Sequence, residues 1–322
     1  MFKSHFAVYI QELIAQKRDI GYKYNEQATM LKRFDMFCVT YYPDEKILSK
    51  EMILHWVTRT CTESVRTQKK RIAPVRSLAE YMSVRGCETY IYPAHSLPRN
   101  DGYIPHIFSD FELANLFKAI DQCAKSSGAP LRHLIFPTIF RLIYCCGLRI
   151  SEAQYLKSNN VDLENGVITV IEAKYGKDRI IPMSKEMTEI CRAYSQKARI
   201  FENEQEYFFP NRFGGETSQS NLYKFFREKL WEANISHGGR GSGPRIHDFR
   251  HTFAVNCLKK WVLEKKDLNA YLPYLKTYLG HYSFNDTAYY LRLTAEMHPE
   301  ITKQIEESCG LLIPQIGGEL NA

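Results

Sequence analysis

The sequence lacks any long apolar run, and it has little glycine or proline. No uncharged apolar stretch approaches the roughly 18–20 residues that a helix needs to cross a bilayer. The amino-terminal segment carries Glu12, Lys17 and Arg18, so it lacks the core of a signal peptide. Glycine and proline number 17 and 13 among 322 residues, which argues against a collagen-like or low-complexity chain. We therefore expect a soluble, cytoplasmic protein.

The cysteines lack the spacing of a metal or disulfide framework. Nine are present, no Cys-x-x-Cys pair occurs, and the adjacent Cys145 and Cys146 lie in an apolar stretch. Zinc modules and disulfide-rich domains need repeated close spacings. We expect reduced thiols in the core and no metal site.

Positive charge exceeds negative charge, with 43 Lys and Arg against 36 Asp and Glu. A net charge of +7 suits a nucleic-acid partner, but it also suits many soluble enzymes. Residues 1–97 hold fifteen Lys and Arg against ten Asp and Glu, and the excess gathers in one predicted helix. That helix presents either an ordinary solvated face or a face along DNA phosphates. The candidate phosphate contacts on it are Arg66, Lys69, Lys70 and Arg76.

The length suits about two domains. Hydrophobic periodicity predicts a small bundle of four helices before residue 90, the fourth from about 62 to 84. Three prolines and the turn signal Asn100-Asp101-Gly102 then break the pattern. We predict a helical domain over 1–92, a linker over 93–107, a second domain over 108–300 and a tail over 301–322.

The second domain has helical periodicity interrupted by short strand-like runs. Ser109 and Glu112 have capping-box spacing and predict the start of a helix. Asn165-Gly166 between two β-prone runs predicts an antiparallel hairpin. The expected fold is mainly α with a small antiparallel β-sheet. Strands are predicted near 161–163, 167–171 and 179–183, and the later helices over 187–201, 221–233, 248–262, 270–279 and 286–293.

Four polar stretches of the second domain stand out together. They are Gly147 to Glu152, the turn bearing Lys174, His247 to His251, and Leu279 to His281 followed by Tyr290. Each alone has a structural explanation, because an arginine after a helix-ending glycine can cap a carbonyl and a turn lysine usually faces solvent. Their common order and spacing is what favours a shared chemical role.

In that order and spacing the chain resembles the tyrosine recombinases, the phage-integrase type of site-specific DNA recombinase. The family carries Gly-x-Arg-x-x-Glu, a hairpin lysine about 25 residues later, His-x-x-Arg, Leu-Gly-His, and a tyrosine nine positions after that histidine. Tyr289 competes with Tyr290 as nucleophile, but spacing favours Tyr290, and adjacent helical residues point about 100° apart. The resemblance implies the catalytic set Arg149, Lys174, His247, Arg250, His281 and Tyr290, with Glu152 orienting the catalytic groups.

The resemblance also implies the reaction. Double-stranded DNA is cut and rejoined through a 3′-phosphotyrosine, without metal, ATP or nicotinamide. Arg149 and Arg250 would grip the non-bridging phosphate oxygens bidentately. His247 would be the acid or base, Lys174 would protonate the departing 5′ oxygen, and His281 would hydrogen-bond the phosphate or the nucleophile's surroundings.

The resemblance further implies an N-terminal core-binding domain and a catalytic domain over 108–300. Four protomers would assemble on a specific DNA site, with an accessory directionality factor as a further candidate partner. Independently of the resemblance, the apolar residues of the tail over 301–322 predict a segment that packs on a neighbouring protomer. When bound to DNA the protein would be nucleoid-associated. The Gly238 to Gly243 loop contains Arg240 and is followed by Arg245, and it either contacts the DNA backbone or contacts nothing.

The expected biological role is an integrase or transposase of a mobile element. A Xer-like dimer resolvase or an invertase remains an alternative. A type IB topoisomerase-like enzyme and a catalytically inactive DNA-binding accessory protein are further alternatives.

Overall fold

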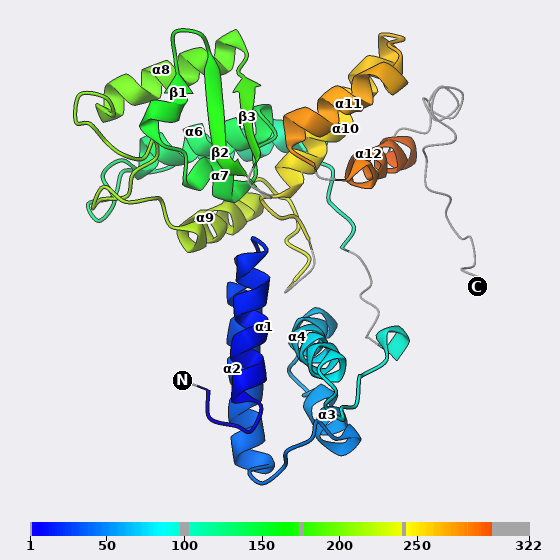
Figure 1. The fold of residues 1–322 in the computed structure, drawn as a ribbon. Helices are drawn as coiled ribbons and strands as arrows, with labels where there is room; N and C mark the ends of the chain where they lie inside the picture. The colour runs from blue at the N-terminus through cyan, green and yellow to red at the C-terminus, as the bar shows by residue number, and fades with distance from the viewer. Residues whose placement is uncertain (1, 97–102, 174–176, 240–242, 282, 298–322) are drawn as a thin grey trace. The chain divides into compact units, whose positions relative to one another are not determined.

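The chain divides into two compact units, residues 1–103 and residues 104–322 (Figure 1). The computed structural model describes residues 2–96, 103–173, 177–239, 243–281 and 283–297. The division falls inside the segment 93–107 that the sequence predicts as a linker. In the described residues, no helix is both long enough and apolar enough to cross a membrane.

Helices form the described part of the first unit. The last of them packs against the other three and buries Ile72, Val75 and Leu78. This helix begins at Val65, three residues later than predicted, because the hydroxyl of Ser64 accepts a hydrogen bond from the Thr67 amide and caps it. The helices are α1 (Ala7–Asp19), α2 (Asn25–Tyr41), α3 (Lys50–Val57) and α4 (Val65–Val84), followed by the short 3-10 helix η1 (Ala94–Ser96).

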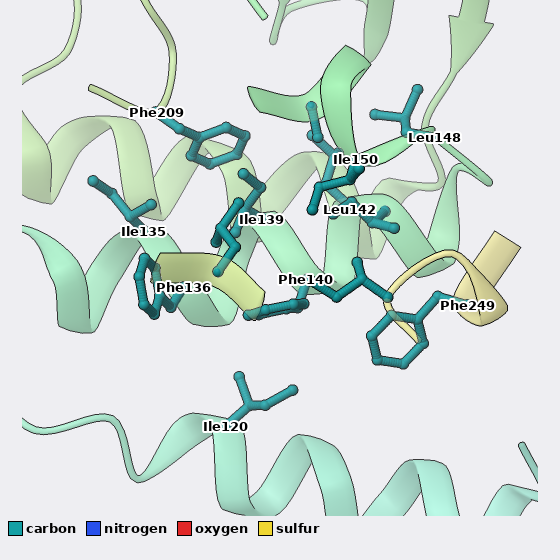
Figure 2. Close-up of a cluster of buried hydrophobic side chains, with 14 of the residues drawn as sticks. Ile120, Ile135, Phe136, Ile139, Phe140, Leu142, Leu148, Ile150, Phe209 and Phe249 are labelled. Carbon is teal, nitrogen blue, oxygen red and sulfur yellow. The ribbon is translucent and has the colours of Figure 1, made fainter. Parts of the chain in front are cut away.

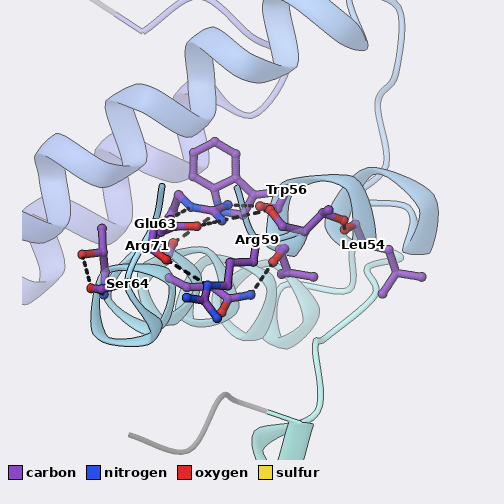
Figure 3. A network of polar contacts seen from close by, with 10 residues as sticks. Leu54, Trp56, Arg59, Glu63, Ser64 and Arg71 are labelled. Atoms are coloured by element: carbon purple, nitrogen blue, oxygen red, sulfur yellow. Dashed lines mark hydrogen bonds and ion pairs between the residues drawn. The ribbon is translucent and has the colours of Figure 1, made fainter. Parts of the chain in front are cut away.

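A largely buried ion pair closes the turn between α3 and α4 (Figure 3). Arg71 donates to the Glu63 carboxylate from Nε at 3.0 Å and from Nη2 at 2.8 Å. It also donates to the carbonyls of Trp56 and Thr58, and Arg59 donates to the Glu63 carbonyl. Arg71 therefore stabilises the fold, unlike the exposed cations of the same charged run.

The second unit is mainly helical with a three-stranded antiparallel sheet in the order β1-β2-β3, which confirms the predicted fold class. Helix α6 is its centre and packs against α5, α7, α8 and α10. The elements are α5 (Asp110–Asp121), α6 (Arg132–Cys145), α7 (Ile150–Gln154), η2 (Ser158–Asn160), β1 (Val161–Asp162), β2 (Val167–Ala173), β3 (Lys177–Pro182), α8 (Lys185–Ala198), α9 (Gln219–Glu232), α10 (Asp248–Leu263), α11 (Leu268–Leu279) and α12 (Phe284–Met297).

The local signals of this unit form as the sequence predicts. Ser109 and Glu112 make a complete capping box at the start of α5. Asp162 pairs with Val167 across the first hairpin, which confirms the antiparallel turn at Asn165-Gly166. Gly166 has a φ of +66°, the left-handed conformation that favours glycine.

The core of the second unit brings the start of α10 against α6 (Figure 2). Phe249 at the start of α10 stacks on Phe117 with 5.6 Å between ring centroids, and its ring lies 6.2 Å from that of Phe140 on α6. Phe249 has no exposed surface, so its burial fixes the first turn of α10. That turn carries His247 and Arg250.

The described cysteines form no disulfide, and not all of them are buried. Cys38, Cys123 and Cys146 are buried, whereas Cys61 and Cys145 are exposed. The prediction of core thiols is wrong for these two. Cys145 ends α6 one position before the buried Cys146, about 100° away around the helix, and Cys61 lies in the turn before α4.

Candidate active site

Two glycine-terminated helix ends build the frame of the site. Gly147 after α6 and Gly280 after α11 have φ values of +58° and +65°. At the second end the amide of His281 donates to the Lys276 carbonyl at 3.0 Å, the long hydrogen bond that closes a glycine-capped helix terminus. Each reversal turns carbonyl oxygens of the helix end towards arginine side chains.

Arg250 is held by both helix ends. Its Nη1 donates to the Gly147 carbonyl at 2.8 Å and its Nη2 donates to the Leu279 carbonyl. Its side chain is 1% exposed, and its Nη1 lies 4.0 Å from the Glu152 carboxylate. Burial, followed by the charge of Arg149, lowers the pKa of Arg250 to about 10, so the group stays charged at neutral pH.

Arg149 lies at the start of α7 and is fixed by one carboxylate and one carbonyl. Its Nη1 donates to Glu152 at 2.6 Å, its backbone N–H donates to the same carboxylate at 2.8 Å, and its Nη2 donates to the Gly280 carbonyl at 3.0 Å. The Gly-x-Arg-x-x-Glu stretch therefore forms the start of a helix, where Arg149 binds Glu152 three residues later.

Glu152 also binds a third arginine, which the sequence analysis did not identify. Arg179 on β3 donates to both carboxylate oxygens, at 2.9 and 2.7 Å. Burial would raise the pKa of Glu152, but the hydrogen bonds and charge of Arg179, followed by Arg149, lower it to about 2. Among the described residues, one carboxylate thus forms ion pairs with three guanidiniums.

Three histidines beside these arginines are held neutral. Burial, followed by the positive charge of Arg250, lowers the pKa of His247 to about 4 and that of His281 to about 3. Burial, followed by the charge of His247 and then Arg250, lowers the pKa of His251 to about 3. An environment that opposes added positive charge favours an anionic ligand.

Tyr290 on α12 lies between two of these histidines. Its ring stacks on His281 at 5.7 Å between centroids and lies 5.5 Å from His251. The tyrosine is 2% exposed, and burial raises its pKa, partly offset by the charge and hydrogen bond of Arg250. The adjacent Tyr289 is less buried and packs near Arg292.

Comparison with known proteins identifies the fold and the family. Residues 108–297 match the model of the phage integrase family. The chain belongs to this family of tyrosine recombinases. It is 32% identical over 287 residues to the putative integrase/recombinase y4rE of Sinorhizobium fredii, covering 88% of this chain and 90% of the relative.

Two further similarities extend over most of the chain. Putative integrase/recombinase y4rB of the same organism is 29% identical over 308 residues, covering 94% of this chain and 98% of the relative. The solved structure of the XerH site-specific recombinase bound to palindromic difH substrate, a post-cleavage complex, shares the fold. It aligns with a TM-score of 0.63 at 20% identity, covering 91% of this chain and 83% of that chain.

The structure brings together every residue of the family pattern that it describes. Lys174 and Arg240 lie outside the described residues, as does the tail over 301–322. Sequence reasoning missed Arg179 and His251, which lies one position after Arg250 and touches Tyr290. The residues that meet in the site are Arg149, Glu152, Arg179, His247, Arg250, His251, His281 and Tyr290.

The predicted phosphate contacts of α4 differ in their surroundings. Arg66 and Lys69 are exposed, and neither has an ion pair within the described part of the chain. Lys70 is exposed but pairs with Glu26 at 3.1 Å. Arg76 pairs with Glu80 and donates to the Tyr92 carbonyl.

Arg245 lies near the start of α10, where its backbone N–H donates to Asp248 at 2.8 Å. Among the described residues, no group of three His, Cys, Asp or Glu side chains could hold a metal ion.

Proposed function

We propose that this recombinase cuts and rejoins duplex DNA by forming a 3′-phosphotyrosine at Tyr290. The observation that supports it is the meeting of Arg149 and Arg250 with a buried phenol. Three guanidiniums face one carboxylate, so the site has an uncompensated positive charge. A phosphodiester supplies the matching negative charge.

In the proposed reaction the phenol oxygen of Tyr290 attacks the phosphorus, and the bond from phosphorus to the 5′ oxygen breaks. The pentacoordinate transition state concentrates charge on the two non-bridging oxygens. Arg149 and Arg250 each spend part of their five N–H donors on protein oxygens and keep the rest for the phosphate. Removing one such donor typically costs about 2.7–4 kcal/mol of transition-state stabilisation.

The proposed proton transfers use groups on either side of the phosphate. His247 is neutral in the free protein, so it can accept a proton, and a bound phosphate raises the pKa of a nearby imidazole. We assign His247 the acid–base role, and His281 a hydrogen bond to the phosphate. The departing 5′ oxygen takes its proton from Lys174 in this scheme.

For the DNA partner, we propose that the first unit is the core-binding domain and that α4 lies along the phosphates. The support is its exposed Arg66 and Lys69. The XerH neighbour was solved bound to its palindromic difH substrate. We further propose that four protomers assemble on the recombination site, with the tail over 301–322 packed on a neighbour.

For the biological role, we propose an integrase or transposase of a mobile element. Its support is that both Sinorhizobium fredii relatives are named putative integrase/recombinase. A resolvase of chromosome dimers would use the same chemistry and differ in the DNA site.

The experiment that tests the chemistry captures the covalent intermediate. The full chain is incubated with nicked duplexes whose central segment is randomised, and adducts that survive SDS denaturation are isolated and sequenced. Tyr290→Phe should form no adduct, and Tyr289→Phe should keep it. An adduct formed by Tyr290→Phe would exclude this nucleophile, and absence of an adduct with the wild-type chain would exclude the proposed reaction.

The captured sequences also test the role. Captured sequences that match the ends of the genetic element carrying the gene would support an integrase or transposase. Recovery of one chromosomal site unrelated to any element would instead indicate dimer resolution.

A further inference from the structure

Arg179 has no assigned role in the proposed reaction, yet its guanidinium is bound on every nitrogen. Nε donates to the Tyr278 carbonyl at 2.9 Å, and Nη1 and Nη2 donate to the two oxygens of Glu152. Its side chain is 7% exposed. A planar bidentate pair of this kind fixes both distance and orientation, which a lysine cannot do.

The first consequence concerns the Glu152 carboxylate. Each of its oxygens is shared, since Oε1 accepts from Arg149 Nη1 and Arg179 Nη1, and Oε2 accepts from the Arg149 amide and Arg179 Nη2. Without Arg179 the carboxylate could turn towards Arg149 or Arg250 and neutralise it. Arg179 therefore binds negative charge that would otherwise reduce the positive charge that Arg149 and Arg250 offer to the transition state.

The second consequence concerns the end of α11. Arg179 donates to the Tyr278 carbonyl and packs against Gly280. A Cβ atom added at Gly280 would lie 3.2 Å from Nη1 of Arg179. The next carbonyls along the chain, those of Leu279 and Gly280, accept from Arg250 and Arg149. One side chain thus touches both supports of Arg149, the carboxylate and the helix end.

We propose that Arg179 is a positioning residue that fixes Glu152 and the end of α11, so that Arg149 and Arg250 present their free N–H groups to the scissile phosphate. The inference rests on the proposed function. It assigns Arg179 no contact with DNA, so it predicts a loss of reaction rate without a loss of DNA affinity.

The kinetic test compares Arg179→Met and Arg179→Lys with wild type in single-turnover adduct formation, at saturating concentrations of a duplex found by the capture experiment. A misplaced catalytic group costs about 10- to 100-fold in rate, so Arg179→Met should slow adduct formation by that factor with unchanged Kd. Arg179→Lys keeps the charge but loses the bidentate geometry of the guanidinium, so its rate of adduct formation should lie between those of wild type and Arg179→Met. Arg192→Met is the matched control, because Arg192 also binds a glutamate and a carbonyl but lies on α8 outside the site.

Two comparisons separate this role from other causes of a slow variant. A duplex with sulfur in place of the bridging 5′ oxygen needs no leaving-group proton, so it should rescue Lys174→Ala but not Arg179→Met. The double variant Arg179→Met/Glu152→Gln should lose less rate than the product of the two single losses, because each single change already breaks the same Arg179–Glu152 interaction. Rescue by sulfur, full additivity, or a rate within about twofold of wild type would overturn the proposal.

An activity-independent readout keeps the inference separate from the proposed function. In the DNA-free protein, the Arg149 side-chain N–H signals should be sharp in NMR spectra, because Glu152 and Gly280 hold the guanidinium. They should broaden in Arg179→Met and stay sharp in Arg192→Met. Unchanged signals in Arg179→Met would overturn the positioning role, whereas a wild-type chain that forms no adduct would overturn only the proposed reaction.

Discussion

The imidazole of His281 stacks on the phenol ring of Tyr290, with 5.7 Å between centroids and 20° between planes. The stack is set by the helix that carries the tyrosine, because His281 Nδ1 lies 2.9 Å from the hydroxyl of Thr287, one turn before Tyr290. Helix α12 therefore fixes the orientation of its own tyrosine and of the histidine against it.

Replacing Thr287 with valine tests this arrangement. The change keeps the shape of the side chain but removes the hydrogen bond to His281, and an orphaned buried polar group costs about 1–3 kcal/mol. We expect adduct formation to slow by about 5- to 30-fold, the equivalent of 1–2 kcal/mol, in single-turnover assays. Thr294→Val is the control, since the Thr294 hydroxyl donates to the Tyr290 carbonyl and not to His281. Equal rates for the two variants would exclude a role for the Thr287 contact.

Gly280→Ala separates backbone strain from crowding of the site. A left-handed conformation costs a non-glycine residue about 1–2 kcal/mol. Gly280 and Gly86 both have positive φ, but a Cβ at Gly280 presses on Arg179 whereas one at Gly86 meets nothing within 4 Å. We expect urea unfolding to show a similar loss of stability for both alanine variants. Only Gly280→Ala should slow adduct formation, and an equal effect of Gly86→Ala would contradict the contact with Arg179.

The sequence predicts the local parts of the site well, because those parts are local in structure. Glycine after α6 and after α11 ends each helix, and the capping geometry follows from a few neighbouring residues. The Arg149–Glu152 pair is also local, since the two residues lie three apart at a helix start. The spacing of these segments resembles that of the family, and this resemblance predicts that they meet in one site.

Arg179 could not be predicted in the same way. Its partners Glu152 and Tyr278 lie 27 and 99 residues away. Alternation along β3 offered one signal, because a strand that buries Ile181 also buries Arg179 and exposes Ile180. A buried arginine needs an acidic partner, but the alternation of buried and exposed residues does not indicate which carboxylate that partner is. His251 is similar, since its contact with Tyr290 depends on the packing of α12 against α10.

The histidines predict how stability depends on pH. Folding holds the pKa of His247 at about 4 and those of His251 and His281 at about 3, below the ordinary value of about 6.5. As pH falls below about 6.5, the unfolded chain binds protons that the folded chain does not, so the free energy of unfolding decreases. Each histidine adds a slope of at most about 1.4 kcal/mol per pH unit.

Urea unfolding of the DNA-free protein between pH 7.5 and 5 measures this slope. Glu152, with its pKa lowered to about 2, adds a loss of stability only below about pH 4.5, outside the window. His281→Asn should flatten the dependence, because one of the three groups no longer titrates. An unchanged slope in this variant would show that His281 is not held neutral in the folded protein.

The last prediction concerns the exposed cations of α4. If Arg66 and Lys69 contact phosphates, each contact releases counterions and contributes about 0.9 to the slope of log K against log salt. The double variant Arg66→Ala/Lys69→Ala should therefore make that negative slope shallower by about 1.8 on any duplex, measured by fluorescence anisotropy over a salt series. Arg76→Ala should change the slope less, because its guanidinium already binds Glu80 and the Tyr92 carbonyl. A double variant with the wild-type slope would exclude this face of α4 from the DNA interface.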